Sequence, residues 1–125
     1  MRWALLFLGG GIGTILRYEL AGLVQGHAGA RFPWGTFAVN VSGCFLIGVI
    51  ATLADERALL SSPARLFLTV GILGGFTTFS TFGLESWRLV EAGELAGALA
   101  NAAGSVAAGM LALVAGVWLA RLATT

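Results

Sequence analysis

The stretch Gly74-Gly75-Phe76-Thr77-Thr78-Phe79-Ser80-Thr81-Phe82-Gly83 decides how this chain folds. It combines an adjacent pair of glycines with four hydroxyl side chains and three phenylalanines, inside a segment that is otherwise apolar. We expect the helix to open from Gly74 to Thr78. In hydrocarbon the freed amides and carbonyls find no water, so such a break survives only where protein covers it or where it lines an ion path.

The overall composition indicates a membrane protein. The chain has 125 residues, of which 58% are hydrophobic and 10% charged, and its mean hydropathy is +0.91. Four apolar stretches each approach the roughly 20 residues that a bilayer crossing needs. The predicted spans cover residues 3–24, 34–53, 66–90 and 95–122. The sequence therefore predicts an all-α membrane protein with one integral membrane domain over residues 1–125, whose third transmembrane helix is broken near its middle.

A secretory signal peptide is the alternative interpretation of the first span, because Arg2 precedes an apolar run. This run continues past the usual length of a signal, and Arg17-Tyr18-Glu19 lies where a cleavage region holds small residues. Tryptophan favours the membrane interface, and each predicted span has one near an end, namely Trp3, Trp34, Trp87 and Trp118. These features favour four spans.

The charges exclude some partners and leave the orientation open. A net charge of +1 without a basic cluster does not support nucleic-acid binding. With both termini on one side, that side holds Arg2, Arg57, Arg65 and Arg121, and the other holds Arg31 and Arg88. This bias is weak. It is equally compatible with one orientation that has cytoplasmic termini and with insertion in both orientations.

Polar side chains at membrane depth are few, and each needs a partner or a task. The Asn40 amide can bind an anion or join two helices. Asn101 and Ser105 lie four residues apart in the fourth span, where they predict a donor-bearing groove. The hydroxyls beside the glycine pair either bond to carbonyls one turn back or face an ion; they belong to Thr77, Thr78, Ser80 and Thr81.

Three further sets of side chains are candidates for a role in ion binding or in packing. Phe79 and Phe82 lie three apart, and their positive ring edges can accompany an anion, although such pairs also serve packing. Arg17 either reaches to the headgroups or stabilises an anion at a vestibule. We expect Glu85 to pair with a nearby arginine or to cap polar backbone.

One histidine and one cysteine, His27 and Cys44, do not make a catalytic or metal-binding cluster, so an enzyme is not expected.

Pairs of small residues at a spacing of four predict close approach between helices, within one chain and between copies. The pairs are Gly9 with Gly13, Gly71 with Gly75, Ala100 with Gly104, Ser105 with Gly109, and Ala112 with Gly116.

Together, these motifs resemble the CrcB/Fluc family of bacterial fluoride channels. The resemblance is carried by Gly11-Ile-Gly13-Thr-Ile-Leu-Arg17-Tyr18, by Gly35-Thr36-Phe-Ala-Val-Asn40-Val-Ser-Gly43-Cys44-Phe45, and by the string from Gly74 to Phe82 with Glu85. It implies a passive fluoride-selective channel that exports cytoplasmic fluoride across the bacterial plasma (inner) membrane. It also implies an antiparallel, dual-topology homodimer embedded in lipid, with two pores and a structural sodium ion (Na⁺) at the dimer centre.

The resemblance further implies roles for single residues. The main-chain carbonyls of Gly74 and Thr77 from each subunit would hold the sodium ion. The residues implied along the fluoride path are Asn40 as donor, Phe79 and Phe82 as ring edges, and Ser80, Thr81 and Ser105 as a polar track. Arg17 would lie at the vestibule, and Gly109 stands where the resemblance leads us to expect a polar residue.

Two other classes of protein stay open on the sequence. A proton-coupled exporter of the small multidrug-resistance kind would use a carboxylate in the first span, for which Glu19 is the available residue. An accessory subunit would dock a larger partner through its small-residue faces.

Overall fold

The structure is a computed structural model that describes residues 1–125, and it contains helices and no strand. The elements in chain order are α1 (Arg2–Ala28), α2 (Trp34–Ala51), η1 (Thr52–Glu56), α3 (Ser62–Arg65), η2 (Leu66–Leu73), α4 (Gly74–Phe76), α5 (Ser80–Glu91) and α6 (Leu95–Ala123). Both η elements are π-helical turns that continue a neighbouring α-helix. The all-α prediction is confirmed.

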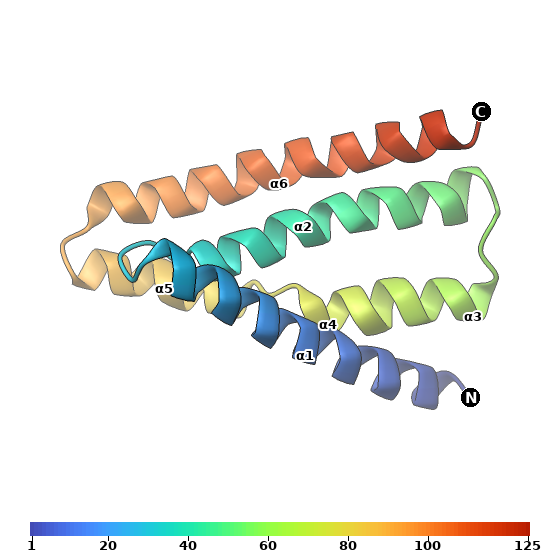
Figure 1. Ribbon diagram of the computed structural model, residues 1–125, viewed down its shortest axis with the longest axis horizontal. Coiled ribbons are helices and arrows are strands. Elements are labelled where there is room, and N and C mark those ends of the chain that lie inside the picture. The colour runs from blue at the N-terminus through green and yellow to red at the C-terminus, as the bar shows by residue number, and fades with distance from the viewer.

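Four helical stretches are long and apolar enough to cross a membrane: Arg2–Ala28, Trp34–Glu56, Ser62–Glu91 and Leu95–Ala123. They alternate in direction, so both termini and the connection between η1 and α3 lie at one end of the molecule, on the right in Figure 1. Each stretch encloses one of the predicted spans and extends it by a few residues. Helical hydrogen bonding continues into the polar ends because water or headgroups satisfy the last carbonyls there.

The third stretch is broken, as predicted, but the break lies further along the chain. Gly74–Phe76 stay helical as α4, and Thr77, Thr78 and Phe79 carry no helix. The Thr77 amide still completes the helix by donating to the Leu73 carbonyl at 3.0 Å. The Thr78 amide instead donates to Asn40 Oδ1 at 2.9 Å. The Asn40 side chain on α2 therefore determines where the helix ends, and the glycine pair does not determine it.

Helix α1 crosses η2 and α4 at backbone-to-backbone distance. A Cβ added at Gly9 would lie 2.9 Å from the Gly71 Cα, and one added at Gly75 would lie 2.4 Å from the Gly10 carbonyl oxygen. On the other side of the bundle, a Cβ at Gly116 of α6 would lie 2.2 Å from a carbonyl oxygen of α2. These members of the predicted small-residue pairs thus serve contacts within one chain.

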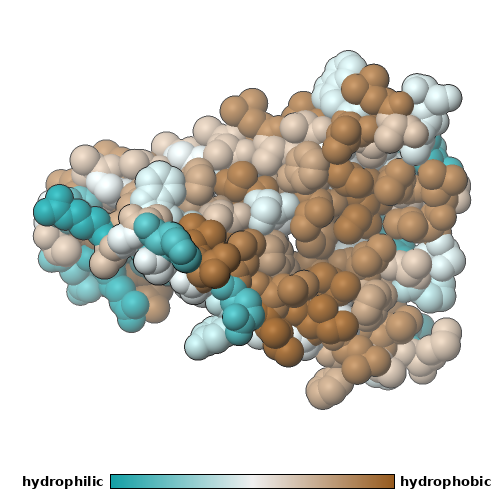
Figure 2. Space-filling view, viewed as in Figure 1, coloured by the Kyte–Doolittle hydropathy of each residue, from teal (hydrophilic) through white to brown (hydrophobic).

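Little of the chain is buried, and the core is small. Val39, Leu73 and Phe76 form a buried cluster between α2 and the broken stretch. Most large apolar side chains face outward, and Figure 2 shows them covering most of the visible face, with hydrophilic residues gathered toward the ends. The four tryptophans are exposed near helix ends. This surface suits a lipid environment or a second copy of the chain.

Candidate functional site

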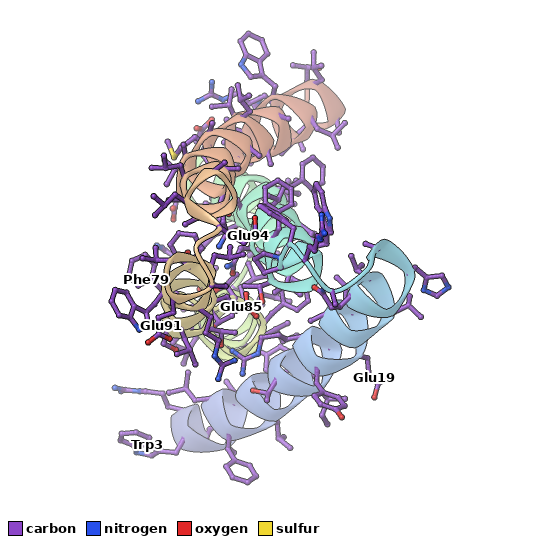
Figure 3. The ribbon with its side chains drawn as sticks, turned by 90° about the vertical axis from the view of Figure 1, so that its left-hand side faces the viewer. Trp3, Glu19, Phe79, Glu85, Glu91 and Glu94 are labelled. Carbon is purple, nitrogen blue, oxygen red and sulfur yellow. The ribbon has the colours of Figure 1, made fainter.

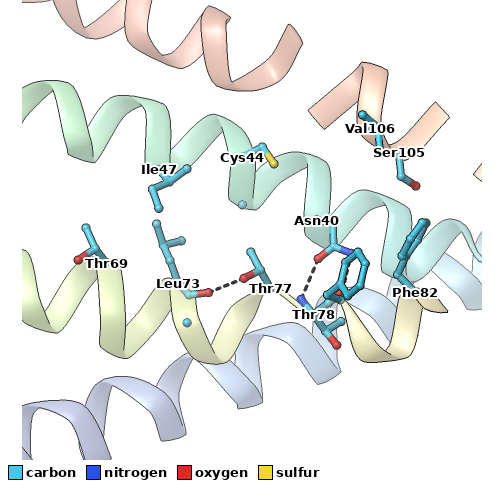
Figure 4. Close-up of a pocket in the computed structure, with 13 residues that line it drawn as sticks. Asn40, Cys44, Ile47, Thr69, Leu73, Thr77, Thr78, Phe82, Ser105 and Val106 are labelled. Carbon is cyan, nitrogen blue, oxygen red and sulfur yellow. Dashed lines mark hydrogen bonds between the residues drawn. The ribbon is translucent and has the colours of Figure 1, made fainter. Parts of the chain in front are cut away.

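Asn40 holds the break open from the neighbouring helix. Its Nδ2 donates to the Thr78 carbonyl at 2.8 Å, while its Oδ1 accepts from the Thr78 amide at 2.9 Å. The side chain thereby replaces both backbone bonds that Thr78 would make in an unbroken helix. Figure 4 shows the one to the Thr78 amide. Asn40 therefore joins two helices, which is one of its two expected roles. The second Nδ2 hydrogen has no acceptor in the protein and remains available to a ligand.

A cavity of about 450 Å³ lies beside the break (Figure 4). Its walls include most of the residues singled out from the sequence, namely Asn40, Gly74, Thr77, Phe79, Phe82 and Ser105. The remaining walls are largely apolar, with Ile47 and Val106 among them. The structure thus gathers residues from α2, α4, α5, α6 and the break around one space that offers neutral donors and no charged side chain.

Phe79 and Phe82 form a pair on the cavity wall. Their ring centroids are 5.6 Å apart, and their planes are inclined by 41°. Phe79 is 84% exposed, and Figure 3 draws it on the outside of the bundle. A large ring in this position does not serve the packing of its own chain, so the packing interpretation is not supported for Phe79.

The hydroxyls around the break have different partners. Thr77 Oγ1 donates back to the Leu73 carbonyl at 2.9 Å, which is the usual arrangement of a membrane hydroxyl. Thr81 is bonded to Thr78 Oγ1 through both its amide and its hydroxyl. Ser80 is exposed and does not line the cavity beside the break, whereas Ser105 does. The predicted polar track is therefore discontinuous within a single chain.

A second cavity, of about 500 Å³, forms a vestibule between α1, α2 and α5. The residues in its walls include Arg17, Glu19, Thr36, Thr81 and Glu85. Arg17 Nη1 lies 3.5 Å from the Thr77 carbonyl oxygen, at the limit of a hydrogen bond. Of the two alternatives for Arg17, this position agrees with the vestibule and not with the headgroups, because α1 crosses the broken stretch and directs this side chain toward the break.

Glu85 does not pair with an arginine. Its Oε1 accepts from Thr36 Oγ1 at 2.9 Å, and its Oε2 is buried without a partner. Figure 3 shows Glu85 pointing into the bundle, whereas the nearby Arg88 is exposed. Arg88 follows Glu85 by about one turn of α5, yet its side chain is exposed and the two groups form no ion pair. No local pattern predicts the contact between Thr36 and Glu85, because the two residues lie 49 positions apart in the chain.

Two carbonyl groups at the break are suitable ligands for a hard cation. The Gly74 carbonyl accepts no hydrogen bond, because the amide that would reach it, that of Thr78, is bonded to Asn40. The Thr77 carbonyl is approached only by Arg17 at 3.5 Å and keeps a free lone pair. Unwound carbonyls of this kind bind sodium in membrane proteins. The oxygen chemistry therefore fits the ion that the resemblance implies.

Gly109 serves packing and does not extend the polar track. It is buried, and a Cβ there would lie 3.2 Å from the Cys44 sulfur atom. Position 109 offers no donor, so the polar stripe of α6 ends at Ser105. Asn101 lies one turn before Ser105 and is 1% exposed. From the sequence it was expected only to contribute to that polar stripe.

Comparison with known proteins matches nearly the whole chain to one family. The family described as "CrcB-like protein, Camphor Resistance (CrcB)" matches residues 4–117. Three similar curated proteins carry the name "Fluoride-specific ion channel FluC". The one from Phocaeicola vulgatus is 47% identical, over 94% of this chain and 96% of the relative. The one from Geobacter sulfurreducens is 51% identical over 90% of each chain, and the one from Thermus thermophilus is 52% identical over 87% and 86%.

Proposed function

The chain belongs to the CrcB family, and from that premise we propose that it is a passive, fluoride-selective ion channel. Relatives that cover nearly the whole chain are named as channels and not as enzymes. The observation that carries the proposal is the cavity beside the break, where a neutral amide donor and two phenylalanine rings meet. It lies within a multi-pass membrane protein.

Fluoride is small and strongly hydrated, so a pore must replace its water with close hydrogen-bond donors. Asn40 supplies its second amide hydrogen, and the rings of Phe79 and Phe82 supply positive edges. None of these groups carries a full charge, which keeps the anion from being held too tightly. Arg17 lies in the neighbouring vestibule, where its charge attracts anions toward the cavity.

We propose that the working unit is an antiparallel homodimer. Phe79 and Ser80 are exposed at membrane depth, and lipid cannot satisfy the polar groups beside them. A second copy that covers the break would enclose the cavity and provide its missing wall. Insertion in both orientations agrees with the weak arginine bias.

The same pairing would create the sodium site. Each copy contributes the Gly74 and Thr77 carbonyls, and the free Gly74 oxygen supports this assignment. The ion would supply positive charge that holds the two breaks together. Its role is structural, since the cavity residues alone contact the anion.

In a bacterial plasma membrane such a channel would let fluoride leave down its electrochemical gradient. Fluoride enters cells as its uncharged acid and dissociates inside, so a passive path outward lowers the internal concentration. The alternative of a proton-coupled exporter gains no support, because Glu19 is exposed at the vestibule and does not lie among the four helices (Figure 3).

The test is fluoride efflux from liposomes that contain the purified protein, followed with a fluoride-selective electrode. We expect rapid fluoride efflux that does not respond to an imposed proton gradient. Liposomes loaded with chloride and followed with a chloride-selective electrode should release no chloride. Asn40→Asp should abolish it, because a carboxylate replaces the donor with an acceptor of the wrong charge. Fluoride retention by the unchanged protein, or transport that requires a proton gradient, would contradict the proposal.

A further inference from the structure

Asn101 connects two walls of the cavity. It lies on α6 and is 1% exposed. Its Nδ2 donates to Ser86 Oγ at 2.9 Å, and Ser86 Oγ donates to the Phe82 carbonyl at 2.8 Å. On its other side, Asn101 Oδ1 accepts from Ser105 Oγ at 3.3 Å. Phe82 and Ser105 both line the cavity, so a chain of hydrogen bonds runs from one wall to the other through a buried amide.

Both hydroxyl hydrogens in this chain of hydrogen bonds have an acceptor, that of Ser86 at the Phe82 carbonyl and that of Ser105 at Asn101 Oδ1. A serine hydroxyl has one hydrogen, and that of Ser105 is donated to Asn101. Ser105 therefore cannot donate to an anion in the cavity while this bond persists. If the hydroxyl turns toward an anion, Asn101 Oδ1 is left buried without a donor, which is unfavourable.

We propose that Asn101 is a positioning residue that weakens the grip of Ser105 on fluoride by competing for its hydroxyl hydrogen. The inference rests on the proposed function. A bound anion accepts a charge-assisted hydrogen bond from the Ser105 hydroxyl, and this bond is stronger than the one to Asn101. Asn101 recovers the hydrogen when the anion moves on, because the 3.3 Å bond is long but remains the only one available to its oxygen. Weak, exchangeable contacts of this kind permit rapid conduction.

A different role for Asn101 has to be separated from this one. A buried amide also joins helices, and the bond to Ser86 ties α6 to α5. The two roles use different atoms, because Nδ2 faces Ser86 and Oδ1 faces Ser105. Substitutions at positions 86 and 105 can therefore distinguish them.

The experiment measures fluoride flux through the reconstituted protein at increasing fluoride concentrations. Asn101→Leu has a similar size and no acceptor, so Ser105 should hold fluoride more tightly. We expect the concentration for half-maximal flux to fall by about fivefold, with a lower maximal flux. In a Ser105→Ala background, Asn101→Leu should produce no such shift.

Ser86→Ala is the matched control, since it removes the tie to α5 and keeps the bond between Asn101 and Ser105. It should leave the half-maximal concentration unchanged. If Ser86→Ala reproduces the shift, or if the shift persists without the Ser105 hydroxyl, Asn101 is only a tie between helices and the proposal is overturned.

Failure of the inference can be told from failure of the proposed function. Normal flux in the unchanged protein with an unshifted Asn101→Leu midpoint overturns the inference alone, whereas absence of fluoride flux in the unchanged protein overturns both. Should Asn101→Leu elute differently from the unchanged protein on size exclusion, Asn101→Ala removes the same acceptor in an alanine-rich stretch and is judged by the same midpoint.

Discussion

Glu85 is a carboxylate held inside the bundle by a single hydroxyl. Thr36→Val would keep the shape of the side chain and leave both carboxylate oxygens without a donor. We expect this change to lower stability by about 1–3 kcal/mol, because a buried acceptor loses its partner. Thermal unfolding in detergent measures the loss. Thr14→Val is the control, since Thr14 is exposed and its hydroxyl makes no hydrogen bond, and equal effects of the two changes would contradict the prediction.

Arg17 places a positive charge near the break, and in the proposed channel this charge would act on anions at a distance. Arg17→Gln should lower fluoride flux by about tenfold at low ionic strength, because the vestibule no longer attracts anions. The difference from the unchanged protein should shrink when an impermeant salt is added, since screening shortens the reach of the charge. Arg31→Gln removes the same charge from the exposed connection between α1 and α2 and should have a smaller effect. A salt-independent loss for Arg17→Gln would argue for a structural role.

Residue types at membrane depth could be recognised from the sequence, but their directions could not. Asn40 was identified because an amide in an apolar span needs a partner, yet that partner, Thr78, lies 38 residues away. The direction of Arg17 depends on the angle at which α1 crosses the broken stretch. Glu85 was expected to pair with an arginine or to cap polar backbone, and it instead accepts a hydrogen bond from Thr36, 49 residues away. Each of these outcomes depends on packing between helices, which no local pattern encodes.

At the scale of the elements, glycines allow α1 and the broken stretch to pack with their backbones in contact. A Cβ added at Gly13 would lie 2.0 Å from the Ile72 carbonyl oxygen, closer than any real contact. Gly13→Ala should therefore separate the two helices and destabilise the protein by about 3 kcal/mol or more. Gly26→Ala, in the same helix but with no atom within 4 Å of the added Cβ, should be neutral or slightly stabilising. Thermal unfolding of both variants tests the contrast, and a tolerated Gly13→Ala would contradict the close packing.

The existence of the elements followed from the sequence more directly than their ends did. Apolar run lengths gave four helices, because a bilayer crossing fixes the length that a span needs. The break was expected from Gly74 onward because glycine lowers helix propensity, yet Gly74–Phe76 remain helical. Asn40 determines the position of the break by taking the Thr78 amide. The π-helical turn η2 was not anticipated, since its pattern of apolar residues does not differ from that of an α-helix.

At the scale of the whole molecule, the proposed homodimer rests on the exposed break and on the small core of one chain. The protein in detergent should have twice the 12.9 kDa mass of one chain when light scattering is corrected for bound detergent. A monomer mass would contradict the dimer. Substitution of Phe79 with alanine should leave the fold of one chain intact, since this ring is 84% exposed, and should weaken the dimer.

The antiparallel arrangement makes a separate prediction about the termini, which both lie at one end of the helical bundle (Figure 1). Cys44 is the only cysteine, and Cys44→Ala with Thr125→Cys moves the thiol to the exposed C-terminus. In intact cells a membrane-impermeant maleimide should then label about half of the chains, because the arginine bias is too weak to impose one orientation. Permeabilised cells, in which all chains should react, provide the control. Complete labelling or none in intact cells would establish a single orientation and exclude an antiparallel pair, even if the dimer mass were observed.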